Sequence, residues 1–214
     1  MTLKPYKTLL KAAESEFVIH KSRFIGQAAP AQSEEEALAF LNAVRARHPD
    51  ANHNCYAYII GSNMGIMRYN DDGEPGGTAG MPIIEVMKAR QVTNCAVVVT
   101  RYFGGILLGA GGLTRAYAQG CTVAINAAGV GVMHPSVRLL MDVDYPMLNK
   151  VEYYLKSAPC LVEEKSFAEV ITFSLLVKQT DEAQLVEDLT ALSDGRLQPI
   201  RFDEMYLAWP ETQA

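Results

Sequence analysis

The loop between Asn70 and Pro82 combines three carboxylates with a high density of glycine and proline. Asp71, Asp72 and Glu74 supply the oxygen ligands that hard cations prefer, so one interpretation is a cation or water site. The spacing differs from the twelve-residue loop of an EF-hand. The alternative is a solvated turn whose carboxylates cap a following helix, and the lack of a further acidic partner in the sequence favours it.

A second glycine-rich segment, Arg101–Arg115, follows an apolar run and precedes a helical pattern. This arrangement directs backbone N–H groups toward an anion. The Gly-Lys-Ser/Thr of a phosphate-binding P-loop is absent, and Thr114 stands where the third glycine of a dinucleotide fingerprint belongs. What remains is a flexible turn with arginines and aromatic residues, which is the chemistry of phosphate and base contact. Alternatively, the glycines allow close packing, and at least one of Tyr102 and Phe103 is core because neighbours on a strand point to opposite faces.

The segment His48–Tyr56 places His53 and Cys55 two residues apart, on one face of an expected strand. Such a pair can act as nucleophile and base in catalysis, or it can supply two of the ligands of a metal site. The spacing supplies no third ligand, so a chance pair is favoured. We expect no cofactor and no metal. The segment around Lys21 and Arg23 forms a small basic patch.

Alternating elements position these segments in the first half of the chain. Strands are expected at 17–19, 23–29, 55–60 and 94–100, and helices at 77–90 and 111–128. Ser33 and Glu36 form a capping box that predicts a further helix ending near Arg47.

The second half reads as strand, helix, strand, strand, helix, strand, with a domain boundary between Gly129 and Pro135. The strands are expected at 137–143, 160–165, 168–177 and 197–202. Pro146 begins the first helix, and Thr180 is expected to cap the second, which stops at Asp194-Gly195. The order predicts a ferredoxin-like βαββαβ domain over residues 135–214, after a first domain of residues 1–134.

The composition is that of an ordinary globular protein, 49% hydrophobic and 20% charged. The N-terminus lacks the apolar stretch of an export signal, and no apolar run is long enough to span a bilayer. The four cysteines form no C-x-x-C pair, so we expect a reduced cytoplasmic protein. The first 134 residues carry 12 Lys and Arg against 10 Asp and Glu, and the remainder carries 7 against 14. A polyanion would be repelled by the second half.

Together these segments resemble the IMPACT family in its bacterial, YigZ-type form. The blocks that match are 21–25, 48–51 with His53 and Cys55, the loop 71–80, and 101–117. The resemblance covers residues 15–130 strongly and extends to the ferredoxin-like domain by architecture. It implies an α+β protein of two domains. The first would have the left-handed βαβ fold of the second domain of ribosomal protein five of the small subunit. The second would resemble the last domain of elongation factor G.

Eukaryotic relatives regulate translation through an added N-terminal domain that this sequence does not show, so their partner is not carried over. The leading hypothesis is a ribosome- or RNA-associated binding protein. The alternatives are an enzyme acting on a phosphorylated or peptide-like small molecule, and a protein-interaction module with an acidic second domain. The expected binding residues are Lys21, Arg23, His53, Asp71, Asp72, Glu74, Arg101, Tyr102, Gly104, Gly105, Gly109, Gly111, Gly112 and Arg115.

Overall fold

A computed structural model describes residues 4–210 of the chain, and these divide into two compact units. The first unit contains residues 5–133 and 208–210, and the second contains residue 4 and residues 134–207. Each unit has its own hydrophobic core.

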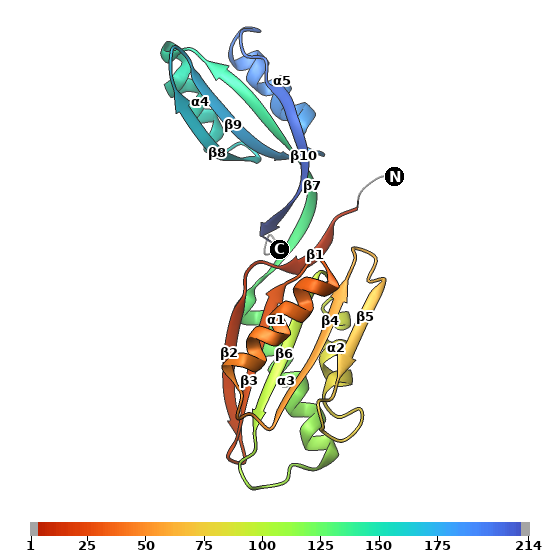
Figure 1. The fold of residues 1–214 in the computed structure, drawn as a ribbon. Coiled ribbons are helices and arrows are strands. Elements are labelled where there is room, and N and C mark those ends of the chain that lie inside the picture. The colour runs from red at the N-terminus through yellow and green to blue at the C-terminus, as the bar shows by residue number, and fades with distance from the viewer. Residues whose placement is uncertain (1–3, 211–214) are drawn as a thin grey trace. The chain divides into compact units, whose positions relative to one another are not determined.

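A five-stranded antiparallel sheet forms the centre of the first unit, in the order β2-β3-β6-β4-β5 (Figure 1). The strands are β2 (Ala13–Ile19), β3 (Ser22–Pro30), β4 (His53–Ile60), β5 (Ile66–Asn70) and β6 (Cys95–Tyr102). The central strand β6 is buried almost throughout, which explains its run of β-branched residues.

Helices cover both faces of this sheet. α1 (Glu34–Arg47) packs on one face, while α2 (Gly80–Ala89) and α3 (Gly109–Ala128) pack together on the other. β5 and β6 run in the same direction with β4 between them. The connection between them passes through α2 behind the sheet in Figure 1 and is left-handed. The fold that the resemblance implied is therefore confirmed.

Two glycines bring α3 close to the sheet. A Cβ at Gly26 would overlap the backbone of Gly120, and one at Gly120 would lie 2.7 Å from Val99. The glycines of the 101–115 segment were expected to allow close packing of a helix on a strand. Gly26 and Gly120 are the residues that allow it here.

The expected helix starts are right for α1 and shifted for the other two. Ser33 accepts a hydrogen bond from the Glu36 backbone at 3.2 Å, as the capping box predicts. α2 begins at Gly80 instead of Gly77, and α3 begins at Gly109 instead of Gly111.

The second unit has the expected order of elements. Its strands are β7 (Val130–Val143), β8 (Cys160–Phe167), β9 (Ile171–Lys178) and β10 (Ile200–Pro210), and its helical segments are η1 (Tyr145–Met147), α4 (Leu148–Leu155) and α5 (Glu182–Leu192). The strand order β10-β7-β9-β8 is that of a ferredoxin-like sheet. The first residues of β7 belong to the first unit, where they pair with β1 (Tyr6–Leu9).

Several details of the second unit differ from expectation. β7 begins at Val130 instead of Val137, and β9 begins at Ile171 instead of Ala168. Thr180 does not cap α5, because its hydroxyl donates to the Asp181 carboxylate and Asp181 itself is the N-cap residue. The last strand begins at Ile200 and extends to Pro210, beyond the expected end at residue 202.

Candidate functional site

Asp71 organises the loop between β5 and α2. Its carboxylate accepts hydrogen bonds from the backbone N–H groups of Gly77, Ala79 and Gly80 at 2.9, 3.1 and 2.8 Å. A carboxylate at a helix N-terminus satisfies the N–H groups that lack partners in the helix. The helix therefore begins at Gly80, and the carboxylate of Asp71 is engaged in capping.

Asp72 connects the same loop to β4 and α1. Its carboxylate accepts the Asn54 backbone N–H at 2.6 Å and pairs with Arg45 at 3.0 Å. Within residues 4–210, no group of histidine, cysteine and acidic side chains is arranged to hold a metal ion. The carboxylate that caps the helix is that of Asp71, as the capping interpretation expects.

Glu74 has a different environment from the two aspartates, because it is buried against β6 and α3. Its Oε1 accepts from Arg101 Nη1 at 2.6 Å and from the Tyr117 hydroxyl at 2.7 Å. The side chains of Glu74 and Arg101 are only 3% and 6% exposed, so water screens this ion pair little. Burial raises the pKa of Tyr117, and its hydroxyl stays protonated as a donor. Arg101 is accordingly committed to Glu74 and is not an open phosphate contact.

His53 and Cys55 both contact the backbone of the 71–72 loop instead of each other. His53 Nδ1 lies 2.8 Å from the Asp72 carbonyl oxygen, and Cys55 Sγ donates to the Asp71 carbonyl at 2.9 Å. Burial raises the pKa of the Cys55 thiol, which disfavours a nucleophilic thiolate. A carbonyl only accepts, so Nδ1 carries the proton and Nε2 remains an acceptor in neutral His53. Nε2 lies 3.9 Å from Glu74 Oε1.

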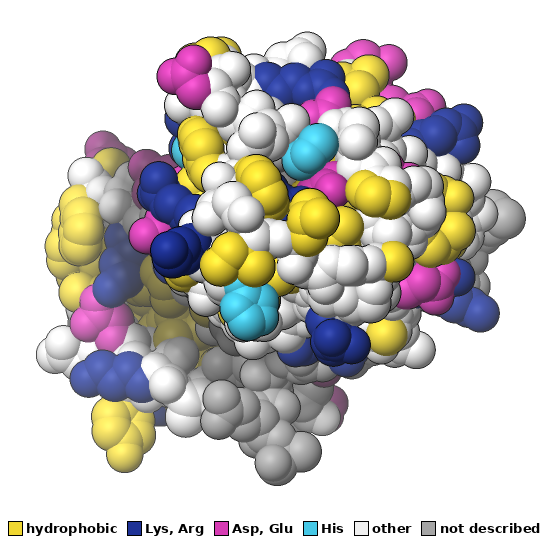
Figure 2. All heavy atoms as spheres, turned by 90° about the horizontal axis from the view of Figure 1, so that it is seen from below, with side chains coloured by type: hydrophobic (Ala, Val, Ile, Leu, Met, Phe, Trp, Pro, Cys, Tyr) yellow, Lys and Arg dark blue, Asp and Glu magenta, His cyan; other side chains and the backbone are white. Residues whose placement is uncertain are grey.

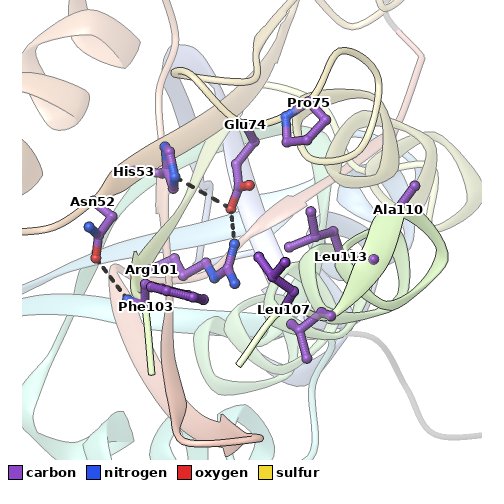
Figure 3. A pocket seen from close by; sticks show the side chains of 11 residues that line it. Asn52, His53, Glu74, Pro75, Arg101, Phe103, Leu107, Ala110 and Leu113 are labelled. Carbon is purple, nitrogen blue, oxygen red and sulfur yellow. Dashed lines mark hydrogen bonds and ion pairs between the residues drawn. The ribbon is translucent and has the colours of Figure 1, made fainter. Parts of the chain in front are cut away.

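A pocket of about 380 Å³ lies beside this cluster (Figure 3). Its polar lining consists of Asn52, His53, Glu74 and Arg101, which come from the ends of β4 and β6 and from the loop before α2. Its apolar lining consists of Pro75, Phe103, Leu107, Leu108, Ala110 and Leu113. A concave, mostly apolar site with a few convergent polar groups is typical of ligand binding.

The mouth of the pocket is apolar and exposed. Phe103, Ile106 and Leu107 are 45, 44 and 86% exposed. Figure 2 shows hydrophobic side chains gathered over the centre of this end of the first unit, with histidine among them and cationic side chains at the margin. Clusters of exposed apolar side chains mark interaction sites more often than isolated ones do.

The glycines of the 101–115 segment shape this mouth in two ways. A Cβ at Gly104 would overlap the Lys21 carbonyl, so this glycine allows the loop to touch the β2–β3 turn. Gly105 and Gly109 have φ of +82° and +67°, a region that strongly favours glycine. Gly111 and Gly112 lie in the first turn of α3, with the Arg115 guanidinium beside Gly111.

The remaining expected residues surround the pocket without lining it. Lys21 lies in the β2–β3 turn, and Arg23 pairs with Glu16 at 2.5 Å. The Arg23 guanidinium also lies over the Tyr102 ring, whose hydroxyl contacts His48 Nδ1 at 2.9 Å. Tyr102 is half-buried and Phe103 is exposed, so the expectation that one of them is core is wrong. β6 ends at Tyr102, and strand alternation does not extend to Phe103.

Three residues of the candidate site were not among the expected binding residues. Tyr117 lies on the buried face of α3, and nothing in the helical period signals its hydroxyl contact with Glu74. Asn52 accepts the Phe103 N–H at 2.7 Å and holds the start of the loop. Leu107 is conspicuous only as an apolar residue between glycines.

Two domain families match the chain. The Impact N-terminal domain matches residues 20–125, and a domain of unknown function, DUF1949, matches residues 141–196. The IMPACT family member YvyE of Bacillus subtilis is 42% identical over 91% of this chain and 89% of its own length. This chain belongs to the IMPACT family.

Other members of the IMPACT family agree with this assignment. YigZ of Escherichia coli is 33% identical over 87% of this chain and 92% of its own. A solved structure, described as the crystal structure of an hypothetical protein, superimposes with a TM-score of 0.60 at 30% identity. That match covers 94% of this chain and 99% of the other, so both units belong to the shared fold.

No helix within residues 4–210 is both long and apolar enough to cross a membrane.

Proposed function

We propose that this IMPACT family protein binds RNA, as part of the ribosome or beside it, through the pocket end of its first unit. The observation that carries the proposal is the exposed Phe103 ring at the mouth of a pocket with a buried polar floor, flanked by exposed cations. Unpaired RNA bases stack on aromatic side chains and present their edges to polar groups, while cations contact the phosphates. A role in translation is in keeping with the likeness to domains of translation factors that the family resemblance implies for both units, which is an analogy at the level of the fold.

Lys21 and Arg115 are the cations best placed for phosphates. Both are exposed, and neither forms an ion pair with another residue in the described part of the chain. Lys21 touches the loop at Gly104, and Arg115 lies beside Gly111 in the first turn of α3. Arg23 and Arg101 are already paired with Glu16 and Glu74. We therefore expect Lys21 and Arg115, and not Arg101, to contact the phosphates.

The proposal is tested by fluorescence anisotropy of a single-stranded ten-nucleotide RNA of mixed sequence, titrated with the full chain at several salt concentrations. Log affinity falls as log salt rises, and each lost phosphate contact reduces the steepness of this fall by about 0.7. Lys21→Ala and Arg115→Ala should each have this effect. Arg68→Ala, which removes an exposed arginine on β5, should not.

Co-sedimentation of the full chain with ribosomes extends this test to the assembled particle. Binding at low salt that weakens as salt rises is the expected result. If the chain binds neither the RNA nor the ribosome at low salt, the proposal is ruled out.

A second candidate function, an enzyme acting on a small molecule, is favoured by one observation. His53 Nε2 is an acceptor at the pocket, held by the Nδ1–H bond to the Asp72 carbonyl, and this is the geometry of a general base. Screening nucleotides and dipeptides by thermal shift distinguishes the two functions. A ligand at 100 times its Kd would stabilise the protein by about 2.7 kcal/mol. A His53→Gln variant should then bind but not turn over the ligand.

A further inference from the structure

The floor of the pocket contains polar atoms that the protein leaves without partners. All of the contacts of Glu74 fall on Oε1, so its Oε2 has no hydrogen-bond partner within residues 4–210. The side chain is nevertheless 3% exposed and lines the pocket. An acceptor that the protein leaves without a partner at a pocket is available to a ligand.

Arg101 has unused hydrogen-bonding capacity of the opposite kind. Its Nη1 pairs with Glu74, while its Nε is buried with no partner among the described residues. The guanidinium lies between the rings of Phe24 and Phe103, with its central carbon 5.5 and 5.4 Å from their centroids. Arg101 lines the pocket, and these contacts hold its guanidinium in a fixed position.

His53 supplies a third polar group with a defined role. Nδ1 donates to the Asp72 carbonyl, which leaves Nε2 as an acceptor when the ring is neutral. Figure 3 shows the Glu74 carboxylate between His53 and Arg101, joined to each by a dashed line. The floor therefore presents two acceptors, His53 and Glu74, followed by the donor Arg101.

The charges of the floor favour a neutral ligand. Glu74 opposes an anion such as a phosphate, and Arg101 opposes a second cation such as an arginine side chain. Because the two form a close ion pair, neither charge is available to attract an opposite one. The ligand must instead match the acceptors and the donor by hydrogen bonding.

We infer that the pocket takes an unpaired guanine base of the bound RNA, an inference that rests on the proposed RNA binding. Guanine presents two neighbouring donors, N2–H and N1–H, and then the acceptor O6 on its Watson–Crick edge. This order complements His53, Glu74 and Arg101, and the Phe103 ring supplies a stacking face.

The other bases match this order less well. Adenine and cytosine each place a ring-nitrogen acceptor beside their amino group, and that acceptor would face the Glu74 carboxylate. Uracil offers one donor between two carbonyls, one of which would face the acceptor Nε2 of His53. A buried mismatch of acceptors costs affinity because both groups lose water without gaining a bond. The pocket of about 380 Å³ is within the range of small-ligand sites.

The test compares two ten-nucleotide RNAs by anisotropy with the full chain: oligouridylate, and the same strand with one central guanosine. A correct hydrogen-bonding match discriminates between bases by about tenfold or more, so the guanosine strand should bind at least that much more tightly. Guanosine alone should compete with it better than adenosine or uridine. Equal binding of both strands would overturn the guanine assignment and leave RNA binding intact. Binding of neither strand at low salt would defeat RNA binding itself.

Two variants separate the role of the pocket from folding. Phe103→Ala should weaken binding of the guanosine strand about tenfold, since stacking on an aromatic side chain is lost. Its matched control is Tyr69→Ala, because Tyr69 is equally exposed, at 44% against 45%, and lies on β5 outside the pocket. His53→Phe removes the Nε2 acceptor and should reduce the preference for guanosine, while circular dichroism checks that the variant folds. An unchanged preference in a folded His53→Phe protein would contradict the assigned edge.

Discussion

Tyr117 donates its hydroxyl to Glu74 Oε1 at 2.7 Å, and both side chains are buried although 43 residues separate them. The bond joins the middle of α3 to the loop before α2. Together with Arg101 on β6, it fixes the floor of the pocket from three elements.

Replacing Tyr117 with phenylalanine should destabilise the protein by about 1.5–3 kcal/mol, the range for a hydrogen bond to a charged group. The loss arises because Glu74 is buried and water cannot take the place of the hydroxyl. Urea denaturation followed by circular dichroism measures the change. Tyr69→Phe is the control, since Tyr69 is 44% exposed, and it should have an effect below about 0.5 kcal/mol. Equal stability of the two variants would show that the Tyr117–Glu74 bond contributes nothing.

Neutralising Glu74 should leave the buried Arg101 charge without compensation. Glu74→Gln is expected to cost about 3 kcal/mol, because an unpaired buried charge is strongly destabilising. Adding Arg101→Met should recover part of this loss. The double-mutant cycle, measured by the same denaturation, reports the coupling. Strictly additive effects would mean that the ion pair is not coupled as its distance of 2.6 Å implies.

Gly104→Ala should destabilise the protein and weaken RNA binding together. A Cβ at this position overlaps the Lys21 carbonyl, so the loop and the β2–β3 turn must separate. Gly76→Ala is the matched control, because a Cβ there meets nothing within 4 Å. Thermal melting and RNA anisotropy of both variants make the comparison, and a Gly104→Ala protein indistinguishable from Gly76→Ala would refute the contact.

Acid should weaken the second unit through Glu163. Hydrogen bonds from Arg138 and Ser174 lower the pKa of Glu163 from 4.5 to about 2. Because the folded pKa is lower, this stabilisation is present above pH 4.5 and is lost as the pH falls toward about 2. Denaturation of the wild type and Glu163→Gln at pH 7 and pH 3 tests this: the difference between them should shrink at pH 3. A difference that is constant with pH would contradict the shift.

The sequence predicted most elements of both units because their patterns are local, although it did not indicate β1 or β5. The capping box at Ser33 and Glu36, and the apolar face of α3, involve residues within a few turns of each other. The βαββαβ order of the second unit likewise follows from consecutive segments. The left-handed connection through α2 has no local signal, and only the family resemblance indicated it.

The sequence indicated which segments form the candidate site, but it did not indicate the contacts that their individual residues make. The glycines and acidic residues of 71–80 and 101–115 were identified, but their roles depend on contacts across the fold. Arg101 was expected to contact phosphate because its local sequence shows no acidic partner. Its partner Glu74 lies 27 residues away on a loop. The pocket that both residues line exists only once β4, β6 and α3 are assembled.

The central claim is that RNA binds at the pocket end of the first unit. Hydrogen–deuterium exchange of the full chain, with and without the guanosine-containing ten-nucleotide RNA at saturation, tests it most directly. The account predicts slower exchange in residues 103–113 and in the turn around Lys21. Slower exchange confined to other segments, with these two unchanged at saturation, would contradict it.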